Sequence, residues 1–152
     1  MAARLFKILG AGVVILGLGT TLAHASADDA IKGRQGCMKA SGKMMSDLAS
    51  MFKGEKPYDA GAVQAAIAAH DAACADWDKW WGEDAQKGET VETWAKPEIW
   101  SDPEGFKTVG EAFYGKFLAL KGSTDEASFK VTFPEAGNGC KGCHEKFRRP
   151  KE

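Results

Sequence analysis

The residues with the most specific chemistry are the two thiols and the imidazole of Cys140-Lys141-Gly142-Cys143-His144. On a helix the two cysteines are about one turn apart, so both can face one edge of a planar ring. Cys-x-x-Cys-His is the attachment pattern of a c-type haem: the thiols bond to its vinyl groups, and the histidine ligates the iron. The sequence therefore predicts one haem c, covalently bound through Cys140 and Cys143, with His144 as the proximal ligand.

Two other uses of a Cys-x-x-Cys pair fit this sequence less well. A thioredoxin-like redox pair lies at the start of a helix that follows a strand, and the residues before Cys140 show no strand pattern. A zinc site needs a second pair of ligands at suitable spacing, and Cys37 and Cys74 are far apart in the chain. We therefore prefer the haem interpretation.

Four helices can be placed from apolar spacing and from capping signals. They are expected from Asp28 or Asp29 to Lys53, from Asp59 to Trp81, from Asp102 to Lys121, and from a capping box of Ser123 and Glu126 to Arg148. Pro134 removes a backbone donor, so a break in the last helix is expected at 131–135. A long polar connection, 82–101, fits a crossover between two helix pairs. The expected fold is all-α, an antiparallel four-helix bundle.

The predicted buried faces place several candidate residues inside the bundle. On the first helix the stripe is Ile31, Met38, Met45, Leu48 and Phe52, and on the second it is Val63, Ile67, His70, Cys74, Trp77 and Trp81. His70 is thus a second histidine near the core. A lone histidine on an inward face is more often a packed core residue than an iron ligand.

The first 25 residues have the pattern of a cleaved signal peptide. Basic residues at Arg4 and Lys7 precede an apolar stretch, 8–22, and Ala23 and Ala25 frame a small-residue cleavage site. A membrane anchor is the alternative, but the stretch is shorter than the ~20 apolar residues that span a bilayer. We expect one mature domain, 26–152, in the periplasm.

The charge balance of the chain limits the kinds of partner it can bind. The chain has 20 basic and 21 acidic residues, and this balance argues against nucleic-acid binding.

An exported location is also oxidising, so cysteines without another use tend to pair. Cys37 and Cys74 lie at nearly equal distances, about 18 residues, on either side of the link near residue 56. In an antiparallel hairpin they are therefore level, which predicts a disulfide; two buried thiols are the alternative.

Several segments together resemble the class II c-type cytochromes, meaning cytochrome c-prime and its low-spin relatives. The segments are Arg34-Gln35 with Met38, Lys53-Gly54-Glu55-Lys56-Pro57-Tyr58-Asp59, Pro97-Glu98-Ile99-Trp100-Ser101-Asp102, and the stretch from Cys140 to Arg148. The resemblance covers most of the chain after the leader. It implies a four-helix bundle with haem near the C-terminal end. Pro134, Cys37 and Cys74 depart from the family pattern.

The resemblance makes Met38 the candidate for the sixth iron ligand. In cytochrome c-prime the residue four after the arginine is usually apolar and leaves the iron five-coordinate, whereas a methionine there ligates in the low-spin relatives. Here that residue is Met38. With His144 it would make a single-electron carrier rather than an enzyme. The alternatives are a core-filling methionine and a five-coordinate binder of nitric oxide or carbon monoxide.

The resemblance also implies roles for two polar residues. Arg34 and Gln35 would bind the haem propionates, the alternative being a solvated face. Arg148 follows His144 by about one helical turn, so its guanidinium would lie over the proximal edge of the haem, or would simply favour the helix dipole. Periplasmic redox proteins are the expected partners. Family members often pair through their first two helices, so both a monomer and a homodimer agree with the sequence.

Overall fold

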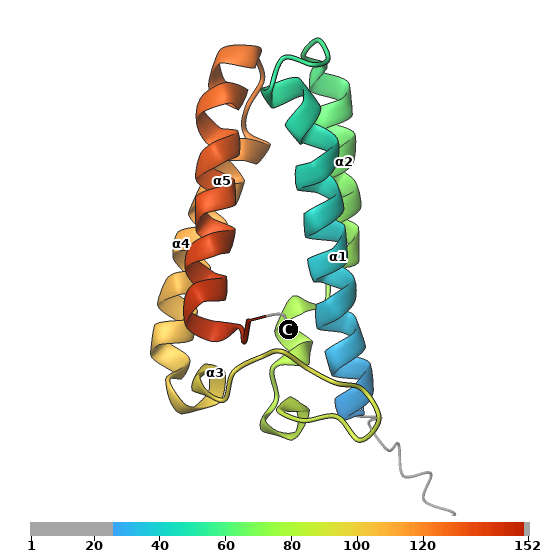
Figure 1. Ribbon diagram of the computed structural model, residues 1–152, viewed down its shortest axis with the longest axis vertical. Helices are drawn as coiled ribbons and strands as arrows, with labels where there is room; N and C mark the ends of the chain where they lie inside the picture. The colour runs from blue at the N-terminus through green and yellow to red at the C-terminus, as the bar shows by residue number, and fades with distance from the viewer. Residues whose placement is uncertain (1–25, 151–152) are drawn as a thin grey trace, which may run out of the picture.

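Four long helices form an antiparallel bundle in the computed structural model, which describes residues 26–150 (Figure 1). The predicted signal peptide, 1–25, lies outside the described residues. The helices are α1 (Ala27–Phe52), α2 (Ala60–Ala73), α4 (Pro103–Lys121) and α5 (Glu126–Phe147). Residues 26–150 contain no strand beyond a single bridge between Ala95 and Arg148. The predicted all-α four-helix bundle is therefore confirmed, and no described helix is long and apolar enough to cross a membrane.

The ends of α1 and α4 follow local capping rules. Ser26, rather than Asp28 or Asp29, caps α1 by accepting the N–H of Asp29. Asp28 instead accepts the backbone N–H groups of the connection at 89–91 and holds that segment against α1. α4 begins as predicted, with the Asp102 carboxylate accepting the N–H of Gly105 at 2.9 Å.

The prediction that the second helix reaches Trp81 is wrong. α2 ends at Ala73, and Trp77–Trp80 form a separate 3-10 turn. The physical reason is Arg34 on α1, whose guanidinium donates to the carbonyls of Trp80 at 3.0 Å and Ala85 at 2.7 Å. Those carbonyls can meet a buried cation only if the chain leaves the helix and crosses the end of the bundle.

The crossing segment packs closely against α1. A Cβ at Gly33 would collide with the Trp80 indole, so only glycine allows this approach. Beyond it, the chain forms a second 3-10 turn (Glu83–Ala85) and a short helix, α3 (Glu98–Ser101), before α4. Figure 1 shows this connection closing the end of the bundle where α5 ends.

The predicted break at Pro134 is also wrong, because α5 is continuous from Glu126 to Phe147. Proline removes only one backbone donor, while α5 is held along its length against α4. Lys116 pairs with Glu135 at 3.0 Å, and a Cβ at Gly139 would lie 3.1 Å from Phe113. Before the proline, Phe129 and Phe133 are buried in one core with Phe117 and Leu120 of α4. Packing before the proline and contacts after it therefore favour an uninterrupted helix.

The capping box of α5 lies two residues later than predicted. Asp125 accepts the N–H of Ser128 at 2.8 Å, and Ser128 Oγ accepts the N–H of Asp125. Ser123 is buried, and its hydroxyl shares a 2.7 Å hydrogen bond with Thr132. The predicted Ser123 and Glu126 box is therefore wrong. Ser123 does not cap α5 but links the Ala119 carbonyl of α4, to which it donates at 3.3 Å, with Thr132 of α5.

The main core lies toward the end of the bundle where α1 meets α2 and α4 meets α5. Its buried residues are Met44, Leu48, Met51, Val63, Ile67, Phe117, Leu120, Phe129, Phe133 and Ala136. The predicted stripe of α1 is thus partly wrong, since Met38 is 39% and Phe52 is 36% exposed. The bond between Cys37 and Cys74 explains the difference, because it turns Cys37 and the residues in line with it toward α2.

The structure joins Cys37 and Cys74 in a disulfide, with their Cα atoms 4.9 Å apart. The bridge closes a loop with a sequence separation of 37 residues, so the chain-entropy relation gives it about 4 kcal/mol. Replacing both cysteines with alanine should lower the free energy of unfolding by that amount, measured by urea denaturation followed by circular dichroism. A loss below about 1 kcal/mol would contradict the cross-link as a major source of stability.

Candidate functional site

The Cys-x-x-Cys-His residues lie on the last turns of α5. Cys140 and Cys143 are half-buried, and they are the free thiols of the described chain, because Cys37 and Cys74 are bonded to each other. Burial raises the pKa of both thiols, and the neighbouring Cys140 raises that of Cys143 further. Both groups are therefore protonated thiols at neutral pH. They fit covalent attachment of a haem through its two vinyl groups.

The imidazole of His144 is in a state that suits an iron ligand. The ring is half-buried, and its nitrogens have no hydrogen-bond or ion-pair partner among residues 26–150. Burial lowers its pKa, and the positive charge of Arg148 lowers it further. The ring is consequently neutral at neutral pH, with a lone pair that no other group of the described chain uses.

Two glycines fix which way this part of α5 faces. Gly139 lies against Phe113 of α4, as its close approach shows. Gly137, two residues earlier and so on the opposite face, lies against α1: a Cβ there would be 3.6 Å from Cε of Met45. α5 therefore presents the Gly137 face to α1. Figure 1 shows the two helices facing each other across the bundle.

That contact sets the register between Met38 and His144. Met38 precedes Met45 by seven residues, and His144 follows Gly137 by seven. Seven residues are close to two helical turns and rise about 10.5 Å, so residues seven apart lie on the same face of their helix. Because α1 and α5 are antiparallel, the step from Met45 to Met38 and the step from Gly137 to His144 lead toward the same end of the bundle. Met38 and His144 therefore lie at the same height on facing sides of the two helices.

Met38 is not a packing residue of the core. Its side chain is 39% exposed, whereas the nearby methionines Met44 and Met51 are 5% and 9% exposed. The alternative that Met38 merely fills a gap is therefore not supported by its burial. Its thioether is a soft donor on a flexible side chain, and it lies on the side of α1 that faces α5, the helix that carries His144.

The structure gives Arg34 and Gln35 hydrogen bonds to the crossing segment. Arg34 is 5% exposed and lies over the Trp81 ring, 4.8 Å from its centroid, while donating to two carbonyls. Gln35 donates to the carbonyl of Glu92 at 2.8 Å. The sequence did not predict these contacts, through which both residues hold the crossing segment against α1. Contact with haem propionates stays a prediction for their remaining N–H groups.

The two remaining candidate residues, Arg148 and His70, pack against aromatic rings. Arg148 lies over the Trp94 ring at 5.4 Å, and its backbone N–H donates to the carbonyl of His144 at 3.0 Å. His70 is 7% exposed and packs on Phe117, with ring centroids 4.6 Å apart. It faces Cys74, which agrees with its predicted role as a core residue. His70 in the last turn of α2 and Cys74 at its C-cap are four residues apart, and this spacing is the signal that could have predicted their contact.

Comparison with known proteins gives consistent matches over the bundle. The family model described as Cytochrome C' matches residues 29–148. A cytochrome c' from Rubrivivax gelatinosus is 33% identical over 123 residues, which is 79% of this chain and 94% of that protein. A cytochrome c-556 from Rhodopseudomonas palustris is 30% identical over 144 residues, covering 93% of this chain and 95% of that one. A nitric oxide complex of a leucine-to-isoleucine variant of cytochrome c prime from Alcaligenes xylosoxidans has a TM-score of 0.72 at 27% identity, covering 84% of this chain and 100% of that one.

Proposed function

The chain belongs to the cytochrome c' family and carries one haem c, and from this premise we propose that it is a single-electron carrier with His144 and Met38 as axial ligands. Haem iron supplies one-electron redox chemistry when bound. The observation that supports the proposal is the approach of Met45 to Gly137, from which helix periodicity puts Met38 level with His144 on the facing helix. Histidine and methionine together raise the reduction potential, because the soft thioether favours ferrous iron.

A second function, binding of nitric oxide or carbon monoxide, is favoured by the similar proteins. The matched family is named for cytochrome c', and the matched structure is a nitric oxide complex. Taken alone, these names support gas binding better than electron transfer, although another relative is named cytochrome c-556. The two functions differ in one contact of this chain, namely whether the Met38 sulfur holds the sixth position.

Carbon monoxide binding to the ferrous holoprotein separates the two functions. Electron transfer predicts slow binding to the wild type, because Met38 must first dissociate, and binding at least tenfold faster to Met38→Ala. A ligand bond worth only about 1.4 kcal/mol already gives that factor. The measurement is stopped-flow absorption at several gas concentrations. If the wild type binds as fast as the variant, gas binding is the better account.

The proposal includes a location, the periplasm, and a class of partner, other redox proteins. The leader pattern at 1–25 supports a periplasmic location, where redox proteins would exchange electrons with this one. The similar proteins are named cytochromes rather than enzymes, so no substrate is expected to be transformed.

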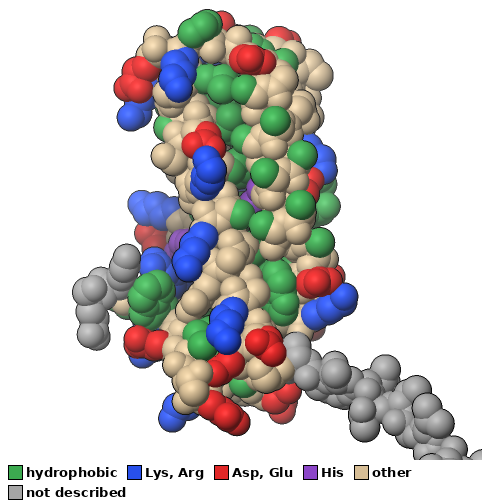
Figure 2. Space-filling model, turned by 90° about the vertical axis from the view of Figure 1, so that its right-hand side faces the viewer, with side chains coloured by type: hydrophobic (Ala, Val, Ile, Leu, Met, Phe, Trp, Pro, Cys, Tyr) green, Lys and Arg blue, Asp and Glu red, His purple; other side chains and the backbone are tan. Residues whose placement is uncertain are grey.

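Figure 2 views the side formed by α1 and α2, where hydrophobic side chains lie in rows between charged ones. α2 has no charged residue from Ala60 to Ala69, which supports this side as the contact between two copies.

A further inference from the structure

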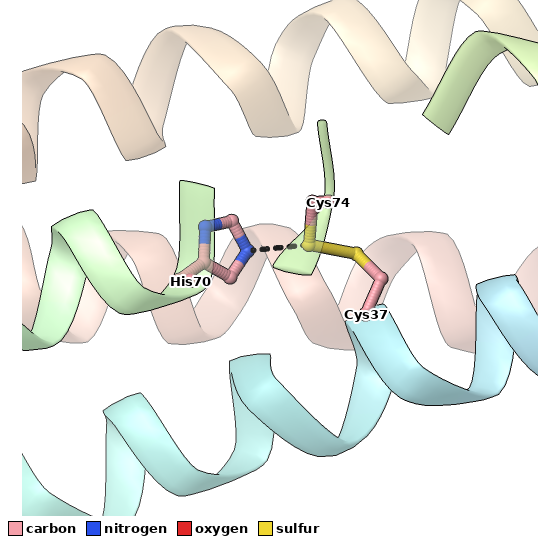
Figure 3. A group of neighbouring side chains, drawn as sticks. All are labelled: Cys37, His70 and Cys74. Carbon is pink, nitrogen blue, oxygen red and sulfur yellow. Dashed lines mark hydrogen bonds between the residues drawn. A yellow bond between two sulfur atoms is a disulfide. The ribbon is translucent and has the colours of Figure 1, made fainter. Parts of the chain in front are cut away.

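A second group of metal-binding side chains lies apart from the Cys-x-x-Cys-His motif, between α1 and α2. It consists of Cys37, His70 and Cys74, which point toward one another in Figure 3. One donor atom from each lies within 4.8 Å of the other two. Cys37 is 3% and His70 is 7% exposed. The haem attachment described above uses none of these three residues.

The histidine of this group is oriented as a metal ligand usually is. Nε2 faces the sulfur of Cys74 at 3.5 Å, and Nδ1 faces the Asp71 carboxylate at 3.4 Å. Asp71 is itself held by Lys121, at 2.6 Å. Ligating histidines commonly donate their second nitrogen to a carboxylate in this way, which fixes the tautomer and directs the other nitrogen at the metal. A disulfide sulfur has no proton to donate, so the bonded cysteines leave that directed lone pair without a donor.

We propose that the dithiol form of this group binds one Zn²⁺ through Cys37, Cys74 and His70. An external dithiol reduces the disulfide: two electrons and two protons pass to the cysteine sulfurs, and the external dithiol becomes a disulfide. Zinc then displaces the two thiol protons to water. Two thiolates and one imidazole form the protein part of a tetrahedral zinc site, with water as the fourth ligand.

Charge and chain geometry favour zinc in particular. Two thiolates neutralise a divalent ion, whereas a monovalent ion would leave a net negative charge in a buried place, which is costly. The two sulfurs must separate to receive the ion. Cys74 allows this, because it is the cap residue after the end of α2 and residues 75–76 belong to no helix. The site can therefore open without unwinding α1.

The test uses the holoprotein, in which Cys140 and Cys143 are blocked as thioethers. The disulfide is reduced with a phosphine under anaerobic conditions, Zn²⁺ is added, and iron and zinc are counted after gel filtration. We expect one zinc per iron in the reduced protein and none in the oxidised protein. Zinc X-ray absorption should show two sulfurs at ~2.3 Å and nitrogen at ~2.0 Å. A reduced protein without stoichiometric zinc, or a site without sulfur, would overturn the proposal.

A pair of matched variants tests the orientation of His70. Asp71→Asn keeps all three ligands but removes the charge behind the ring, so zinc affinity should fall about 10- to 100-fold, measured by competition with a chromophoric chelator. Asp76→Asn is the control, because among residues 26–150 the exposed Asp76 carboxylate pairs only with Lys79. Equal affinities in the two variants would overturn the proposal. Circular dichroism of the reduced protein reports whether the bundle stays folded.

Discussion

Replacing Met38 with alanine should convert the ferric holoprotein from low-spin to high-spin and lower its reduction potential. The expected change is large because the variant loses a ligand of the iron, not a packing contact. Met38 is 39% exposed, so truncating it removes little buried surface and should leave the bundle intact. Electron paramagnetic resonance reports the spin state, and a redox titration reports the potential. A methionine ligand raises the potential relative to its absence, so the sign of the shift is fixed.

Met45→Ala is the matched control for this result. Met45 lies on the same face of α1, two turns from Met38, and its side chain contacts α5 at Gly137. Loss of that contact affects the distance between α1 and α5 without removing the proposed ligand, so this variant should stay low-spin. The claim for Met38 fails if both variants become high-spin together, or if neither does.

Replacing both Cys140 and Cys143 with serine should abolish covalent haem. Serine keeps the size and polarity of the side chain but forms no thioether, so any haem that still binds is held by His144 and by packing alone. The measurement is haem staining after denaturing electrophoresis. Wild type should keep all of its haem on the polypeptide, and the variant none.

The other cysteine pair provides the comparison. Cys37→Ala with Cys74→Ala removes the disulfide between α1 and α2 but leaves the attachment residues unchanged, so it should keep covalent haem while losing stability. Covalent haem that survives in the Cys140 and Cys143 variant, or disappears from the control, would mean that the two pairs have been assigned the wrong way round.

Features with local causes were predictable from the sequence. The haem motif depends on five consecutive residues, and the start of α4 depends on Asp102 and Pro103, whose cap needs nothing beyond the next turn. The level positions of Cys37 and Cys74 followed from the antiparallel hairpin alone. In each case the interacting groups are either neighbours in the chain or related by one short link.

Features set by distant contacts were not predictable in the same way. α2 ends early because Arg34, on another helix, binds the carbonyls of Trp80 and Ala85. α5 passes through Pro134 because core packing of Phe129 and Phe133 before it, and contacts of Glu135 and Gly139 with α4 after it, outweigh one lost hydrogen bond. Local propensity favoured the wrong answer at both positions, and tertiary packing decided the outcome.

The face of α1 is the error that matters most for function. Apolar spacing grouped Met38 with Ile31 and Leu48 on one buried stripe, but the disulfide turns Cys37 toward α2. Met38, the next residue, consequently lies outside the core, on the side that faces α5. Sequence resemblance selected Met38, and the contact between Met45 and Gly137 supplies an independent reason for the same residue. Its ligation stays a prediction.

The most direct test of the central claim is the near-infrared absorption of the ferric wild-type holoprotein at neutral pH. A sulfur bound to ferric iron produces a charge-transfer band there, and histidine ligation alone does not. We predict a low-spin spectrum with this band, as axial ligation by His144 and Met38 requires. A high-spin spectrum without the band would contradict the account and would make this chain a five-coordinate binder of small gases.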